Sequence, residues 1–193
     1  MTRDPHTGII HLVGPGAAGK TTTGTALAAH LGLPFVDLDA AFTAHHGSIT
    51  GYLDRHGYPA YAGRNVEIYL RLVQEARSRC ILALSSGFMT YPNGVHPAYA
   101  NGRLRILSSG STFVLLPSLE EESCVRETVR RQLQRPFART PEREEQVIRE
   151  RFRVYANLPV PKIETMRPIH SIVADLVRLI PEGAPTPEGL NAD

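Results

Sequence analysis

The stretch GPGAAGKTTTG constrains the fold more than any other part of this chain. It has the spacing G-x-x-x-x-G-K-T, which starts at Gly14 and ends with Gly19, Lys20 and Thr21. An apolar run at residues 9–13 precedes it, and a helical pattern follows it. In that setting the glycines let backbone N–H groups point toward phosphates, the lysine reaches the outer phosphates, and the threonine hydroxyl can ligate Mg²⁺. We therefore predict a nucleotide-phosphate loop between a buried strand and a helix.

Short apolar runs alternate with helical patterns along the chain. After residues 9–13, runs typical of strands occur at PFVDLD, CILAL, TFVLL and PVPKIETM. Helical patterns follow Thr21, cover residues 64–78 and Leu119–Ala156 with a break at RPFARTPE, and close with IHSIVADLVRLI. This alternation predicts an α/β protein with a parallel sheet covered on both faces. Because ligands of such sheets bind beyond the carboxyl ends of the strands, we expect the functional residues directly after the apolar runs.

Length and composition limit the kinds of protein that this chain can be. Its 193 residues suffice for one domain with a buried core, which we place at residues 1–180, with a disordered tail at 181–193. A net charge of +2, from 21 Lys and Arg against 19 Asp and Glu, argues against a nucleic-acid-binding surface. No apolar stretch approaches the ~20 residues that span a bilayer, and two cysteines argue against a disulfide framework or a zinc site. We therefore predict a cytoplasmic protein without nucleic-acid or membrane partners.

Two acidic side chains follow the second apolar run. Asp37 and Asp39 alternate along PFVDLD, so both should face the same side of the strand. One of them could help the Thr21 hydroxyl to hold Mg²⁺, and the other could meet a substrate hydroxyl. The alternative is that both cap a helix that starts near Ala40.

Beyond the phosphate loop, the order of the motifs resembles the shikimate kinase family, from about Ile9 to Ile180. GPGAAGKTT resembles the family's phosphate loop, FVDLD its D-x-D strand end, and GSITGYLDRHGYPAY its G-x-S-I segment. ALSSGF stands where the family has three glycines, RQLQRPF resembles its R-P-L lid motif, and ERFRVYANLP its R-x-P-L-Y segment. The resemblance implies a P-loop NTPase fold with five parallel strands and a lid at about residues 130–146. It also implies ATP and Mg²⁺ as cofactors, a small hydroxylated acceptor, and a monomer or weak dimer.

The family's functional residues carry over to the matching positions. On the nucleotide side, Lys20 and Arg135 would stabilise the transferred phosphoryl group, Thr21 with Asp37 would hold the metal, and Arg126 would lie against the adenine. The residues implied for nucleotide binding are Gly14, Gly16, Ala17, Ala18, Gly19, Lys20, Thr21, Thr22 and Arg126.

The lid motif itself favours transfer over mere binding. Arg135 precedes Pro136 in a break between helical stretches, and such a segment can close over ATP and exclude water. We interpret the other arginines nearby as solvated helix charges: Arg130, Arg131, Arg139 and Arg143.

On the acceptor side, Asp39 would bind the substrate hydroxyls and orient the attacking one, and Arg151 would meet a carboxylate of the substrate. The residues implied to surround the acceptor are Asp39, Ala62, Ser85, Ser86, Gly87 and Arg151.

The departures from the family pattern lie mostly on this side. Where the family has F-R-x-x-E this chain has YAGRN, so Ala62 replaces the arginine that grips the shikimate carboxylate and Asn65 replaces the glutamate that steadies it. Losing one charge-assisted bidentate contact typically costs ~1.5–3 kcal/mol of binding. Arg64 lies two positions on and should point away on a helix. Ser85 and Ser86 would add two hydroxymethyl groups to the pocket.

We therefore expect an ATP-dependent kinase that acts on shikimate bound in a modified way, or on a related polyol or cyclitol. One alternative is a gluconate- or nucleotide-type kinase. A second, from another class, is a regulatory module that holds ATP without transferring phosphate. Residues 88–110 have no assigned role: they could shape the acceptor pocket or cover a sheet edge.

Overall fold

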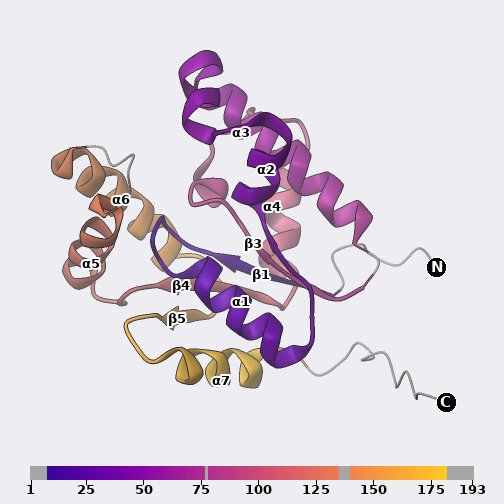
Figure 1. Cartoon of the computed structure of the whole chain (residues 1–193), viewed down its shortest axis with the longest axis vertical. Helices are drawn as coiled ribbons and strands as arrows, with labels where there is room; N and C mark the ends of the chain where they lie inside the picture. The colour runs from indigo at the N-terminus through magenta and orange to yellow at the C-terminus, as the bar shows by residue number, and fades with distance from the viewer. Residues whose placement is uncertain (1–7, 77, 135–139, 182–193) are drawn as a thin grey trace.

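Five strands form a single parallel sheet in the order β2-β3-β1-β4-β5 (Figure 1). The computed structural model describes residues 8–76, 78–134 and 140–181. Every residue of the two longest strands is buried, as continuous apolar runs in a doubly covered sheet require. The α/β fold with five parallel strands that we predicted is therefore confirmed. The strands are β1 (Ile9–Val13), β2 (Phe35–Asp37), β3 (Cys80–Ala83), β4 (Thr112–Leu116) and β5 (Lys162–Glu164).

Alternate residues of β1 point into two separate hydrophobic cores. Ile10 and Leu12 belong to one core, and Ile9 and Val13 belong to the other. The first core is covered by α1 (Lys20–Leu31) and α7 (Ile169–Leu179), which pack against each other. The second core is covered by the remaining helices, so both faces of the sheet are protected from water. These helices are α2 (Leu38–His46), α3 (Ile49–Glu75), α4 (Tyr99–Ser108), α5 (Glu121–Leu133) and α6 (Pro141–Ala156).

Helix α3 starts well before the helical pattern that we recognised at residues 64–78. It begins at Ile49, where the Ser48 hydroxyl accepts a hydrogen bond from the Gly51 N–H, and it bends at Gly57, whose φ is 78°. Glycine tolerates that left-handed conformation, so the kink divides the helix at this point. Only the part after the kink carries a long buried face, which explains why the periodicity was visible there alone.

The second strand is shorter than PFVDLD suggested. It ends at Asp37, and Asp39 lies in the first turn of α2 instead of on the strand. The Asp37 carboxylate accepts hydrogen bonds from the backbone N–H groups of Asp39 (2.9 Å) and Ala40 (3.3 Å). The capping alternative thus holds for Asp37, which caps α2, while the Asp39 side chain is left for other contacts.

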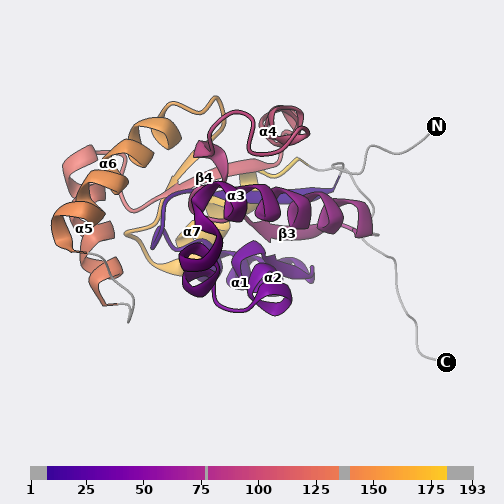
Figure 2. The same ribbon diagram turned by 90° about the horizontal axis from the view of Figure 1, so that it is seen from above.

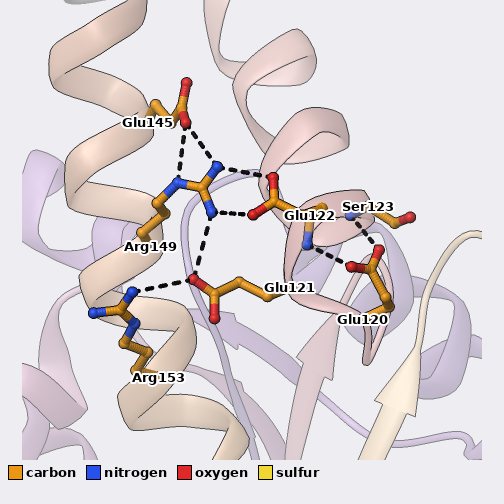
Figure 3. A network of polar contacts seen from close by, with 7 residues as sticks. All are labelled: Glu120, Glu121, Glu122, Ser123, Glu145, Arg149 and Arg153. Carbon is orange, nitrogen blue, oxygen red and sulfur yellow. Dashed lines mark hydrogen bonds and ion pairs between the residues drawn. The ribbon is translucent and has the colours of Figure 1, made fainter.

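Helices α5 and α6 lie side by side at one end of the sheet (Figure 2) and flank residues 135–139. Arg149 of α6 donates to both carboxylate oxygens of Glu122 on α5, at 2.6 and 2.9 Å, and also to Glu145 (Figure 3). The same guanidinium and that of Arg153 reach Glu121 (Figure 3). This hydrogen bonding to Arg149 lowers the pKa of Glu122. The network ties α5 to α6.

The segment at residues 88–110 forms a short 3₁₀ turn, η1 (Phe88–Thr90), followed by α4. Tyr99 at the start of α4 donates a hydrogen bond to the Phe88 carbonyl at 2.7 Å, and Ile106 of α4 is buried.

Within the part of the chain that the structure describes, no helix is long and apolar enough to cross a membrane.

Candidate active site

A cavity of about 500 Å³ opens at the carboxyl ends of the strands. The phosphate loop and the first turn of α1 form its floor. Its walls come from five other groups of residues. They are Asp37 at the end of β2 with Asp39 in α2, Leu84 and Ser86 after β3, Arg131 and Gln132 of α5, Thr165 and Arg167 after β5, and Ile169 and Ile172 of α7.

The phosphate loop is built around positions where only glycine fits. A Cβ on Gly14, whose φ is 150°, would lie 2.3 Å from the carbonyl oxygen of Leu115 on β4. Gly19 has a φ of 89° and forms the N-cap of α1, so the free N–H groups of that helix start at the cavity. Thr165 holds the loop from the other side, because its hydroxyl donates to the Ala18 carbonyl at 2.9 Å. The loop is therefore a rigid cradle that suits an anion.

The Lys20 side chain folds back along the loop. Its Nζ donates to the carbonyl oxygens of Gly14 at 2.8 Å and Pro15 at 2.9 Å. These contacts hold the ammonium group at the cavity that Lys20 itself lines. A positive charge and the N-terminus of α1 thus act on the same space, as the sequence predicted for phosphate binding.

Thr21 and Asp37 are joined directly. The Thr21 hydroxyl donates to Asp37 Oδ2 at 2.7 Å, while Asp37 Oδ1 caps α2. A hydroxyl and a carboxylate in contact at the edge of a phosphate site are the oxygen donors that Mg²⁺ uses, so the pair fits this ion. Among the described residues, no group of three or more His, Cys, Asp or Glu is placed to hold a metal by itself. Phosphate oxygens and water would have to complete the coordination.

Asp39, two residues after Asp37, also lines the cavity. Its Oδ1 accepts hydrogen bonds from the hydroxyls of Ser85 at 2.5 Å and Tyr61 at 3.3 Å. Burial raises the pKa of the Tyr61 hydroxyl well above its ordinary value, and the nearby Asp39 charge raises it further. Tyr61 therefore keeps its proton and remains a donor to Asp39.

Arg151 of α6 contacts the residues that follow β3, next to Asp39. Arg151 donates to the Ser86 hydroxyl at 3.1 Å, and Tyr155 donates to the Ser86 carbonyl at 3.0 Å. Gly87 allows close packing here, since a Cβ on it would lie 2.6 Å from the Tyr58 hydroxyl and 3.2 Å from Arg151 Nη2. Of the two serines predicted for the pocket, only Ser86 lines the cavity, because Ser85 is buried behind it.

Six of the predicted site residues that the structure describes do not line the cavity: Gly14, Ala62, Ser85, Gly87, Arg126 and Arg151. Ala62 is fully buried in the hydrophobic core, so its side chain cannot touch an acceptor in this structure. Arg126 is exposed on α5 and does not line the cavity. Arg135 lies outside the described residues. Arg64 is exposed and pairs with Glu67, as its position on α3 led us to expect.

Arg131, which we interpreted as a solvated charge, instead lines the cavity. Its guanidinium donates to the Ala17 carbonyl of the phosphate loop at 3.1 Å and to Glu127 at 2.6 Å. Hydrogen bonds from Arg130 and Arg131 hold the pKa of Glu127 down at about 2. The spacing of four residues predicts that Glu127 and Arg131 share one helix face, but it does not predict the contact of Arg131 with the phosphate loop. No local pattern pointed to Gln132 or Thr165.

The sheet order, the glycine cradle and the Lys20, Thr21 and Asp37 constellation define a P-loop nucleotide-binding protein of the α/β class. Comparison with known proteins narrows the class. The family model for shikimate kinase matches residues 16–180, and the chain therefore belongs to the shikimate kinase family. The predicted family is confirmed, and the gluconate- or nucleotide-type alternative is not favoured.

Individual relatives agree with this assignment. The chain is 34% identical over 113 residues to shikimate kinase of Paracidovorax citrulli, a match that covers 58% of this chain and 57% of that protein. It is 29% identical over 130 residues to shikimate kinase of Enterococcus faecalis, covering 67% of this chain and 70% of that protein. The alignments thus span about half the length of the first curated relatives. The solved structure of Acinetobacter baumannii shikimate kinase in complex with shikimate superimposes with a TM-score of 0.70 at 26% identity, covering 90% of this chain and 93% of that one.

Proposed function

We propose that this protein is an ATP-dependent phosphotransferase that moves the γ-phosphoryl group of ATP to a hydroxyl of shikimate or a related polyol or cyclitol. The observation that carries the proposal is the shared cavity. Lys20, the Thr21–Asp37 pair and Asp39 all line it, so a phosphate group held by the first three residues would share this space with an acceptor bound at Asp39. The family to which the chain belongs and the solved relative with shikimate bound support the same reaction class.

The chemistry follows from what each side chain can do. A bond forms between the acceptor oxygen and the γ-phosphorus while the bond from that phosphorus to the bridging oxygen breaks, and ADP keeps the electron pair. Asp39 accepts the hydrogen bond of the attacking hydroxyl and takes its proton. Lys20 moves from the loop carbonyls to the outer phosphate oxygens, where it stabilises the charge of the transition state. Mg²⁺, held by Thr21 and Asp37, would supply further positive charge against the phosphate oxygens.

The acceptor is recognised differently from the family pattern. Arg151 is the one cationic side chain among the described residues that contacts the Ser86–Gly87 turn beside Asp39. Position 62, where the family has a second arginine, is occupied by a buried alanine. An acceptor with a single acidic group near Arg151, or with none, therefore suits this wall better than one that needs two guanidinium contacts.

A panel of acceptors tests the proposal. ADP release is measured with shikimate, quinate, gluconate and cyclitols, and phosphorylated products are identified by mass spectrometry. We expect acceptor-stimulated ADP release with at least one of them, and little release without acceptor. Tight ATP binding with no stimulation by any acceptor would instead support the regulatory-module alternative. The roles of Arg126 and Arg135, a cytoplasmic location and a monomeric or weakly dimeric state remain predictions.

A further inference from the structure

Asn65 sits at the centre of a buried hydrogen-bond network behind Asp39. Its side chain is fully buried on α3, one helical turn after Tyr61. The amide nitrogen donates to the Ser85 hydroxyl at 2.8 Å and to the Tyr61 hydroxyl at 2.9 Å. Both hydroxyls in turn bond to Asp39 Oδ1. Two of the positions that depart from the family pattern, Asn65 and Ser85, are therefore joined to the predicted base.

Counting protons fixes the direction of every bond in this network. The amide nitrogen of Asn65 has two hydrogens, and each goes to one hydroxyl oxygen. Each hydroxyl has a single hydrogen left, and Asp39 Oδ1 is its acceptor. A carboxylate in place of Asn65 could not donate, so it would draw the hydroxyl hydrogens of Ser85 and Tyr61 away from Asp39.

Asp39 fixes the orientation of the Asn65 amide, because an amide with its oxygen and nitrogen exchanged would take the two hydroxyl hydrogens away from the carboxylate. The amide oxygen of Asn65, Oδ1, is buried and has no hydrogen-bond partner among the described residues. Leaving a buried carbonyl oxygen unpaired typically costs ~1–3 kcal/mol. The two hydrogen bonds of the Asn65 amide nitrogen therefore orient this side chain, and both lead through a hydroxyl to Asp39.

The surroundings keep the donors in place. The Tyr61 ring packs against Phe42 with centroids 5.0 Å apart and against Tyr58 at 6.1 Å. Ser85 is the second residue after the end of β3 and is buried. Asp39 Oδ1 is thus engaged by two fixed donors, whereas Oδ2 has no hydrogen-bond partner among the described residues, and Asp39 lines the cavity.

We propose that Asn65 is a positioning residue: through Ser85 and Tyr61 it engages Oδ1 of Asp39 within the protein and leaves Oδ2 to receive the attacking hydroxyl of the acceptor. The inference rests on the proposed kinase function. It implies that Asp39 offers one oxygen to the acceptor, in an orientation set by residues that never touch the acceptor.

The test compares Asn65→Leu and Ser85→Ala with a matched control. Asn65→Leu keeps the approximate volume but removes both donors, and Ser85→Ala removes one link of the network. Thr112→Val is the control, because it removes a buried hydroxyl that donates to the Ile106 carbonyl at 2.5 Å on β4, away from the cavity. We expect kcat to fall about tenfold in both network variants while the KM for ATP stays unchanged. The control should keep the kcat of the wild type even though it loses stability.

A second background separates positioning from general damage. In Asp39→Ala, the residue that Asn65 positions is absent, so adding Asn65→Leu should change the residual kcat by less than about twofold. An equal tenfold loss in both backgrounds would overturn the inference, and so would an unchanged kcat in Asn65→Leu alone.

A crystal structure of Asn65→Leu gives a readout that does not depend on turnover. We expect the Asp39 carboxylate to leave its present orientation, and an unmoved Asp39 would contradict the inference. If the wild type phosphorylates no acceptor, the proposed function fails. The Asp39 orientation in the variant would still decide whether Asn65 positions this carboxylate.

Discussion

Gly14 illustrates how one atom decides the shape of the phosphate loop. A Cβ at this position would lie 2.3 Å from the Leu115 carbonyl oxygen, which belongs to the backbone of β4, and the Cβ itself is fixed to the backbone of the loop. We expect Gly14→Ala to lose about 3 kcal/mol or more of unfolding free energy and to lose nucleotide binding, because neither backbone can move away cheaply. The control is Gly32→Ala, where φ is 63° but nothing lies within 4 Å. It should lose only about 1 kcal/mol and bind nucleotide normally. Chemical unfolding and calorimetric titration with an ATP analogue measure both effects, and equal losses in the two variants would contradict this explanation.

At the same scale, the sequence predicted the site residues whose role depends on local backbone geometry. Lys20, Thr21 and Asp37 follow from the spacing of one loop and one strand end, and the structure brings them together. The sequence could not predict the contacts of Arg131 or Asn65, because these contacts join segments that are far apart in the chain. Such partners depend on tertiary packing, which no local spacing encodes.

At the scale of elements, α5 is linked to the phosphate loop through Glu127 and Arg131. Hydrogen bonds from Arg130, which contributes most, and from Arg131 lower the pKa of Glu127 from an ordinary value near 4.5 to about 2. A lowered carboxylate pKa stabilises the folded state above about pH 4.5, and this stabilisation is lost as the pH falls toward 2. We therefore expect wild type to be more stable than Glu127→Gln at neutral pH, with a difference that shrinks below about pH 4.5.

Unfolding by urea at several pH values measures this difference. The control is Glu75→Gln, whose exposed partner Arg71 is 3.9 Å away and which should cost little at any pH. A Glu127→Gln difference that stays constant down to pH 3 would show that the ion pair does not link α5 to stability in the way described.

The order of elements was predictable because strands and helices alternate with clear apolar runs. The boundaries of these strands and helices were less predictable. Asp39 moved from a predicted strand into α2, since Asp37 caps that helix, and α3 extended back to Ile49 across the kink at Gly57. The capping side chain of Asp37 and the kink at Gly57 determine these boundaries, and neither feature is visible in the hydrophobic pattern.

For the whole molecule, we expect nucleotide binding to stabilise the fold. A non-hydrolysable ATP analogue with Mg²⁺, at a hundred times its Kd, should add about 2.7 kcal/mol of stability and raise the melting temperature. Lys20→Ala should reduce this rise at the same analogue concentration, because the ammonium group lines the phosphate cavity. Lys162→Ala is the matched control, since that lysine also donates to a backbone carbonyl, Leu158, but lies away from this cavity. An equal rise of the melting temperature in wild type, Lys20→Ala and Lys162→Ala would show that the nucleotide binds away from this cavity.

The role of Asp39 in phosphoryl transfer is decided by comparing how fast wild type and Asp39→Asn form a phosphorylated alcohol. The product is followed by ³¹P NMR with the best acceptor from the panel, at saturating ATP. Because Asn cannot take the hydroxyl proton, we predict that the rate falls about a hundredfold or more while the affinity for ATP is retained. Product formation by Asp39→Asn at the wild-type rate would contradict the account, and so would a wild type that forms no phosphorylated alcohol.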